Sequence, residues 1–152
     1  MNAKATTLSI LGLAAALLAA LPMASHAADK VVHLAFDNAV KAATASGKLD
    51  GSVKFYLAGT APAGRVTVVN DNVSINRKTN AFGKQEQATC DWALQSALIA
   101  LQDDAKKAGA NAVTDIVGDY NGSEYRDPLN YECHVGFLMS GVELKAKLAK
   151  VD

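Results

Sequence analysis

Residues 85–108 constrain the fold most strongly, because apolar side chains recur there at helical spacing over about six turns. The apolar positions are Cys90, Ala93, Leu94, Ala97, Leu98, Leu101, Ala105 and Ala108. Intervals of three and four residues are typical of an amphipathic helix with one buried face. Lys106, Lys107 and then Gly109 indicate where this helix ends. The many alanines would let it lie close to a sheet.

The segments on either side of this helix show the patterns of β-strands. Before it, residues 53–57, 65–69 and 73–75 are short strand candidates, with a turn at residues 70–72, and residues 36–45 are weakly helical. After it come strand candidates at 112–120, 131–139 and 142–148, with turns at 121–122 and 140–141. A short C-terminal helix is the competing interpretation of the last segment.

These elements predict an α+β fold, with a small mixed or antiparallel sheet and one long amphipathic helix packed on a face. Residues 65–69, 85–108 and 112–120 have the order strand, helix, strand, which fits a right-handed crossover.

The two cysteines predict a covalent link between the long helix and a strand. Cys90 lies on the apolar stripe of the helix, and Cys133 shares a strand face with Tyr131 and Val135. Both therefore face the same interior, and an exported chain matures where thiols are oxidised. We predict a helix-to-strand disulfide that contributes on the order of 4 kcal/mol by the chain-entropy argument.

Residues 1–27 have the features of a secretory signal peptide. Lys4 precedes an apolar run from residue 8 to 21, and Ala24-Ser25-His26-Ala27 resembles a peptidase site. The run is short for a membrane span, although an uncleaved anchor helix is the alternative. We predict cleavage after Ala27, a single domain at 28–152, a periplasmic location and no transmembrane span after cleavage.

Charge and motifs narrow the classes of function. Lys4 is the only charged residue among the first 27, so the 15 basic residues become 14 against 15 acidic ones. A nucleic-acid binder usually has a basic excess, so no nucleic acid is predicted as a partner. Neither Gly47-Lys48 nor Gly83-Lys84 fits a phosphate-binding loop, and G-x-S-x-G, H-E-x-x-H and C-x-x-C motifs do not occur. We predict no catalytic residue, no metal site and no cofactor, and the missing motifs favour a protein that is not an enzyme.

Two clusters nevertheless suit ligand binding. The first lies just before the long helix and consists of Arg77, Lys78, Asn80 and Lys84, where a phosphate or lipid headgroup would meet cations and a helix N-terminus. A plain polar loop with Phe82 packed beneath it is the alternative. The second consists of Glu132 and His134, which share a strand face.

The pair formed by Glu132 and His134 suits acid–base chemistry or a metal. A zinc ion would also draw in His33, with Asp37 as an alternative carboxylate. A solvated strand face is the simpler interpretation of the same two residues.

Four strings resemble a family of short exported bacterial proteins that genomes often label "excinuclease ATPase subunit". They are K-T-N-A-F-G-K (78–84), C-D-W-A-L-Q-S-A-L-I-A-L-Q (90–102), G-A-N-A-V (109–113) and Y-E-C-H-V-G (131–136). The chain is more distantly similar to the RcsF envelope-stress lipoprotein and to YbjQ-like domains, but it has no lipidation cysteine and one disulfide where RcsF has two. The resemblance implies a fold and a compartment, and no mechanism.

The sequence thus predicts a periplasmic, non-enzymatic binding or envelope-associated module whose partner is an envelope protein or a small ligand. The alternative is a small-ligand or metal-binding protein, or an enzyme, that uses Glu132 and His134 or the basic segment 77–84.

Overall fold

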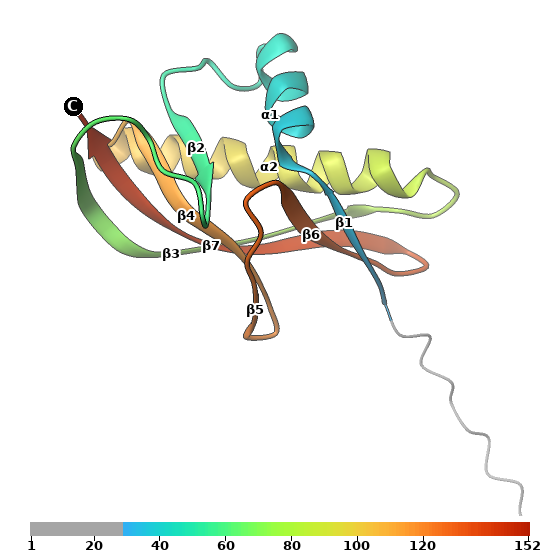
Figure 1. Ribbon diagram of the computed structural model, residues 1–152. Coiled ribbons are helices and arrows are strands. Elements are labelled where there is room, and N and C mark those ends of the chain that lie inside the picture. Colours follow the sequence, from blue (N-terminus) through green and yellow to red (C-terminus); the bar gives the residue numbers. More distant parts are fainter. Residues whose placement is uncertain (1–28) are drawn as a thin grey trace, which may run out of the picture.

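The computed structural model describes residues 29–152, which form a seven-stranded sheet with helices packed on it (Figure 1). The elements are β1 (Lys30–Ala35), α1 (Phe36–Ala45), β2 (Lys54–Leu57), β3 (Val66–Asn80), α2 (Glu86–Lys107), β4 (Ala112–Tyr120), β5 (Ser123–Tyr125), β6 (Asn130–Val135) and β7 (Met139–Val151). The predicted α+β class with a mixed sheet is confirmed. The predicted signal peptide lies outside the described residues.

The long strand β7 organises the sheet. One of its edges pairs antiparallel with β3 from Met139 to Val151. Its other edge pairs first with β6, at Ser140 and Gly141, and then with β4. β1 lies antiparallel to β6, and β2 lies parallel to β4. Because β3 and β4 both run antiparallel to β7, they share a direction, and α2 connects two parallel strands that have β7 between them.

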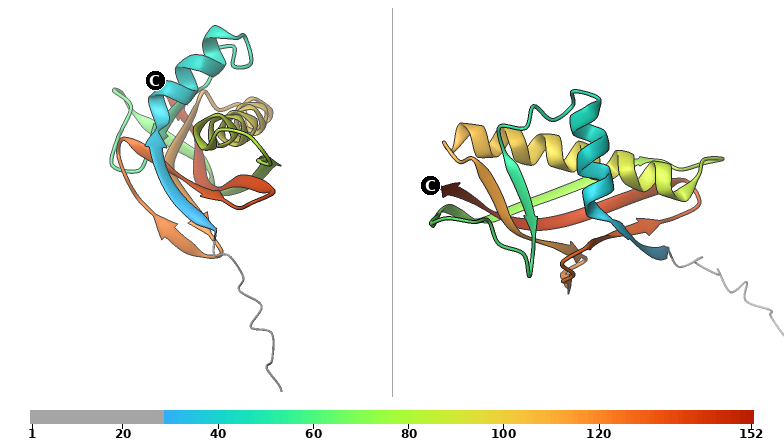
Figure 2. Two further views of the ribbon diagram at one scale, coloured as in Figure 1. Left: turned by 90° about the vertical axis from the view of Figure 1, so that its right-hand side faces the viewer. Right: turned by 45° about the horizontal axis from the view of Figure 1, so that its top comes forward.

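The core lies between α2 and the sheet, and α1 crosses above α2 (Figure 2). The residues of the α2 stripe from Cys90 to Ala105 are at most 1% exposed. They pack against apolar residues of β4, β6 and β7 such as Ile116, Tyr131 and Val142. After α2 the chain turns at Gly109, whose φ is +68°. None of the described helices is long and apolar enough to cross a membrane.

The predicted turn at Ser140-Gly141 is wrong. β6 ends at Val135, the chain turns through residues 136–138, and both Ser140 and Gly141 are paired with β6. The Gly136 N–H donates to the Met139 carbonyl at 2.8 Å and closes this turn. The predicted strand is too long because Phe137 and Met139 continue the apolar alternation of β6. These two side chains are 78% and 45% exposed and do not belong to a buried face. The C-terminal helix considered as an alternative is also wrong, since β7 occupies that segment.

The first half of the basic segment 77–84 is strand. Residues 66–69 and 73–75 belong to one strand, β3, which continues through Arg77 to Asn80. The predicted turn at residues 70–72 is instead an irregularity within β3, where its register against β7 shifts. Pairing with β7 extends the strand past the point where local sequence predicts a loop.

The predicted disulfide is present. Cys90 in α2 and Cys133 in β6 are bonded, with their Cα atoms 5.9 Å apart and both residues fully buried. The link joins residues that are 43 positions apart in the chain.

Replacing both cysteines, as Cys90→Ala with Cys133→Ala, will lower the free energy of unfolding by about 4 kcal/mol, because the unfolded chain regains the entropy of the open loop. We expect a melting temperature lower by roughly 10–20 °C in differential scanning calorimetry. Reductant should shift the wild-type protein in the same direction and leave the variant unchanged. Equal melting temperatures for the oxidised wild type and the variant would reject the stabilising role.

Tyr131 supports a second prediction, about alkaline stability. Its side chain is buried and its hydroxyl donates to Asp91 Oδ1 at 2.8 Å. Burial, and then the Asp91 carboxylate, raise the pKa of Tyr131 above its ordinary value of 10.0. Below that pH the phenol is protonated in both folded and unfolded chains, and above it the unfolded chain ionises first, so stability is lost as pH rises.

The variant Tyr131→Phe removes this ionisation and also one hydrogen bond. At pH 7 it should be less stable than the wild type by about 1 kcal/mol. The difference should shrink or reverse above pH 10, as measured by urea unfolding at a series of pH values. A difference that is constant with pH would show that Tyr131 does not cause alkaline sensitivity.

Candidate functional site

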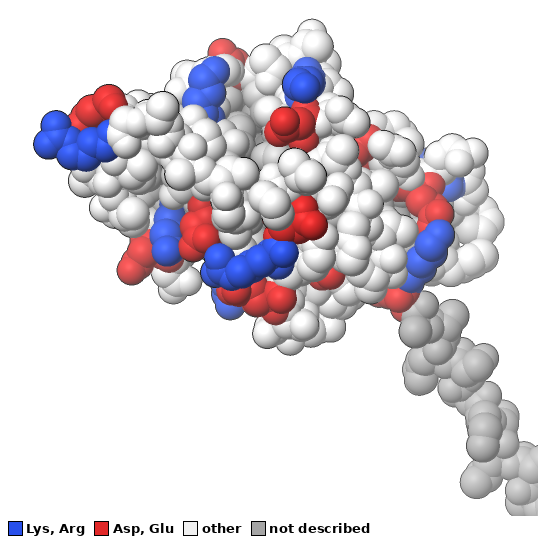
Figure 3. Space-filling model, viewed as in Figure 1, with Lys and Arg blue, Asp and Glu red and all other residues white. Residues whose placement is uncertain are grey.

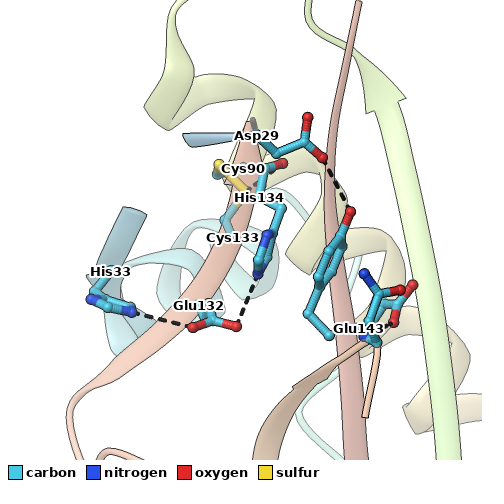
Figure 4. A network of polar contacts seen from close by, with 9 residues as sticks. Asp29, His33, Cys90, Glu132, Cys133, His134 and Glu143 are labelled. Carbon is cyan, nitrogen blue, oxygen red and sulfur yellow. Dashed lines mark hydrogen bonds and ion pairs between the residues drawn. A yellow bond between two sulfur atoms is a disulfide. The ribbon is translucent and has the colours of Figure 1, made fainter. Parts of the chain in front are cut away.

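The candidate site lies on the face of the sheet that is turned away from α2. Alternation along β6 directs Cys133 toward the helix, and therefore Glu132 and His134 toward the open face. β1 pairs with β6 so that His33 stands directly opposite Glu132. The register of these two strands thus brings His33, Glu132 and His134 together (Figure 4).

The Glu132 carboxylate bridges the two imidazoles. Its Oε1 lies 3.0 Å from His134 Nε2, and its Oε2 lies 3.4 Å from His33 Nε2. The side chains of His134 and Glu132 are 13% and 15% exposed, whereas that of His33 is 45% exposed. Each carboxylate oxygen therefore has a histidine partner, and the bond to His134 is the shorter and better shielded of the two.

Each imidazole is also stacked on a tyrosine ring. His134 stacks on Tyr120, at the end of β4, with ring centroids 3.4 Å apart. His33 stacks on Tyr125 of β5 at 4.2 Å. The Tyr120 hydroxyl donates to Asp29 Oδ2 at 3.1 Å. The network therefore joins β1, β4, β5 and β6 across the open face.

Burial is the main cause that raises the pKa of Tyr120 and of Tyr125, and neighbouring carboxylates add to it. Asp29 has this effect on Tyr120, and Asp127 on Tyr125. Both phenols stay protonated at neutral pH, and the Tyr120 hydroxyl donates its proton to the hydrogen bond with Asp29.

Gly118 makes room for this network, and the sequence gives no signal for it. A Cβ atom at this position of β4 would lie 3.3 Å from Tyr125 Cβ and 3.4 Å from Glu132 Cβ. The first distance is tighter than ordinary van der Waals contact, and the second is at its lower limit. The glycine therefore lets β5 approach β4 closely at Tyr125.

A pocket of about 360 Å³ adjoins the network. Its lining includes Asp29, Lys78, Tyr120 and His134, together with the turn and strand residues 136–141. Lys78 belongs to the predicted basic cluster and His134 to the predicted Glu132–His134 cluster. The structure therefore brings one residue of each cluster to the same cavity.

The other residues of the basic cluster do not converge there. Arg77 and Lys78 are adjacent in β3 and so point to opposite faces. Asn80 accepts a hydrogen bond from the Phe82 N–H at 3.0 Å. The Lys84 ammonium lies 5.3 Å from the centre of the Trp92 ring. Glu86, the first residue of α2, pairs with Lys30 at 2.8 Å.

The predicted zinc site is met only in part by the positions of its residues. His33, Glu132 and His134 meet as considered, but Asp37 lies in the first turn of α1. Within residues 29–152, no three histidine, cysteine or acidic side chains are arranged to hold a metal ion. Comparison of the chain with family models, curated proteins and solved structures found no match.

The geometry predicts an unequal contribution of the two histidine contacts to stability. Glu132→Ala removes both contacts, leaves the shielded His134 without its partner, and should lower the free energy of unfolding by about 1–3 kcal/mol. His33→Ala removes a longer and more exposed contact and should cost less than about 1 kcal/mol. Urea unfolding of both variants at neutral pH measures the two values. Equal losses would contradict the arrangement described.

Proposed function

We propose that this protein is a periplasmic, non-enzymatic module that binds the surface of an envelope membrane. The observation that carries this proposal is a group of exposed apolar side chains at one end of the sheet. It consists of Phe82, Phe137, Leu138 and Met139, which are 59%, 78%, 59% and 45% exposed. We call these four residues the apolar tip.

Two connected loops present the apolar tip. The rings of Phe82 and Phe137 meet edge to face, with centroids 5.4 Å apart. The Ala81 N–H donates to the Leu138 carbonyl at 2.8 Å, which ties the loop after β3 to the turn between β6 and β7. The tip is thus held on a paired backbone, and contiguous exposed apolar groups of this kind commonly mark an interaction surface.

Lysines lie beside the tip. Lys78 is in β3 and Lys84 in the loop that carries Phe82, and no acidic side chain within residues 29–152 forms an ion pair with either. Elsewhere, on the face that Figure 3 shows, acidic and basic side chains are interleaved. Apolar side chains flanked by cations suit the interface of an anionic membrane, where burial and charge attraction act together.

Co-sedimentation with vesicles tests this proposal. The protein should bind vesicles of phosphatidylglycerol mixed with phosphatidylcholine, and bind less at high salt because the charge attraction is screened. The double variant Phe137→Ser with Leu138→Ser should lose at least about tenfold in partitioning, since each side chain no longer enters the apolar layer.

Leu129→Ser is the matched control. Leu129 is 71% exposed but lies just before β6, outside the tip, so its replacement should leave binding unchanged. Absence of wild-type binding, or equal losses in the tip variant and the Leu129 variant, would overturn the proposal. Binding of an envelope protein in place of vesicles would assign the tip to a protein partner instead.

A further inference from the structure

The pocket beside the apolar tip contains both signs of charge. Asp29 and Lys78 both line it, and Phe137, Leu138 and Met139 of the tip form part of its wall. We propose that this pocket receives the zwitterionic headgroup of a single lipid, with its ammonium at Asp29 and its phosphate at Lys78. This inference rests on the proposed membrane function and specifies the ligand.

Two glycines of the pocket leave space that the charged side chains occupy. A Cβ atom at Gly136 would lie 2.7 Å from Asp29 Oδ1, and one at Gly141 would lie 2.8 Å from Lys78 Cγ. Neither glycine has a positive φ, so backbone conformation does not require glycine at either position. At Gly141 an added side chain would displace the stem of Lys78 and crowd the Arg77 carbonyl at 3.2 Å, whereas at Gly136 the Asp29 carboxylate would have to move aside.

The groups around the Asp29 carboxylate are fixed in orientation. Its Oδ2 accepts a hydrogen bond from Tyr120, and the Tyr120 ring is stacked on His134. His134 in turn is held by Glu132. The aromatic wall and the carboxylate are therefore positioned before any ligand enters, which lowers the entropic cost of binding.

A zwitterion fits this pocket better than an ion of one sign. A lone phosphate would be attracted by Lys78 but repelled by the Asp29 carboxylate. A lone amine would be attracted by Asp29 but repelled by the Lys78 ammonium. A primary ammonium donates hydrogen bonds to a carboxylate, which a quaternary ammonium cannot do, so phosphoethanolamine is favoured over phosphocholine. The volume of about 360 Å³ is within the usual range for small-ligand pockets. The apolar wall offers a path for the acyl chains toward the tip.

Isothermal titration with a short-chain phosphatidylethanolamine, below its micelle concentration, tests the headgroup assignment on the protein secreted with its own N-terminal segment. The wild type should bind this lipid more tightly than the matching phosphatidylcholine. Asp29→Asn and Lys78→Gln should each weaken binding about tenfold or more, through loss of one charged partner. Both residues are exposed, so neither variant threatens the core.

Lys41→Gln is the matched control, because Lys41 is an exposed lysine of α1 that neither lines the pocket nor lies beside the tip. Its affinity for the short-chain lipid should equal that of the wild type. Three results would overturn the headgroup assignment. They are equal affinities for the two lipids, displacement of the lipid by inorganic phosphate as effectively as by phosphoethanolamine, and an unchanged affinity in Asp29→Asn.

The vesicle experiment separates this inference from the proposed function. Vesicles of phosphatidylglycerol and phosphatidylcholine contain no ethanolamine headgroup, so the apolar tip alone should support binding to them. If the wild type binds these vesicles but not the short-chain phosphatidylethanolamine, the pocket assignment fails and the membrane function stands. If it binds neither, both fail.

Discussion

The disulfide between Cys90 and Cys133 fixes which face of β6 is turned toward α2, and the rest of the site depends on this choice. In a strand, neighbouring side chains point to opposite faces, so burial of Cys133 directs Glu132 and His134 outward. A shift of one residue in register would bury the glutamate and the histidine and expose the cysteine. The covalent link to a helix in the core therefore secures the orientation of polar groups that it does not touch.

The β7 strand supplies the second constraint, because it pairs with β3 on one edge and with β6 on the other. Gly141 lies at the place where both pairings meet, opposite Lys78 in β3 and His134 in β6. Residues far apart in the chain thus become neighbours across a single glycine. This arrangement places a cation of β3 in the same pocket as the aromatic groups of β4 and β6.

Periodic features of the sequence predicted the α+β class, the disulfide and the shared face of Glu132 and His134, because each depends on local alternation or helical spacing. The positions of the β6–β7 turn and the length of β3 depend on pairing with β7, which local sequence does not encode. The alternation through Phe137 and Met139 is a surface feature rather than a buried face. The sequence named His33 only as part of a zinc site, and strand register is what places it opposite Glu132. The roles of Gly118, Gly136 and Gly141 depend on close contacts between strands or with side chains from other segments.

The Glu132 network and the pocket at Lys78 and Asp29 differ in how far their polar groups already have partners. Both oxygens of Glu132 already have imidazole partners, and both imidazoles are stacked, so a substrate at this position would have to displace existing contacts. Lys78 has no ion-pair partner within residues 29–152, and Asp29 has a single hydrogen-bond donor in Tyr120. Unused charge adjacent to exposed apolar groups favours recognition of an external ligand. The Glu132 network then acts as the rigid support of that surface, since it orients Tyr120 and His134 beside the pocket.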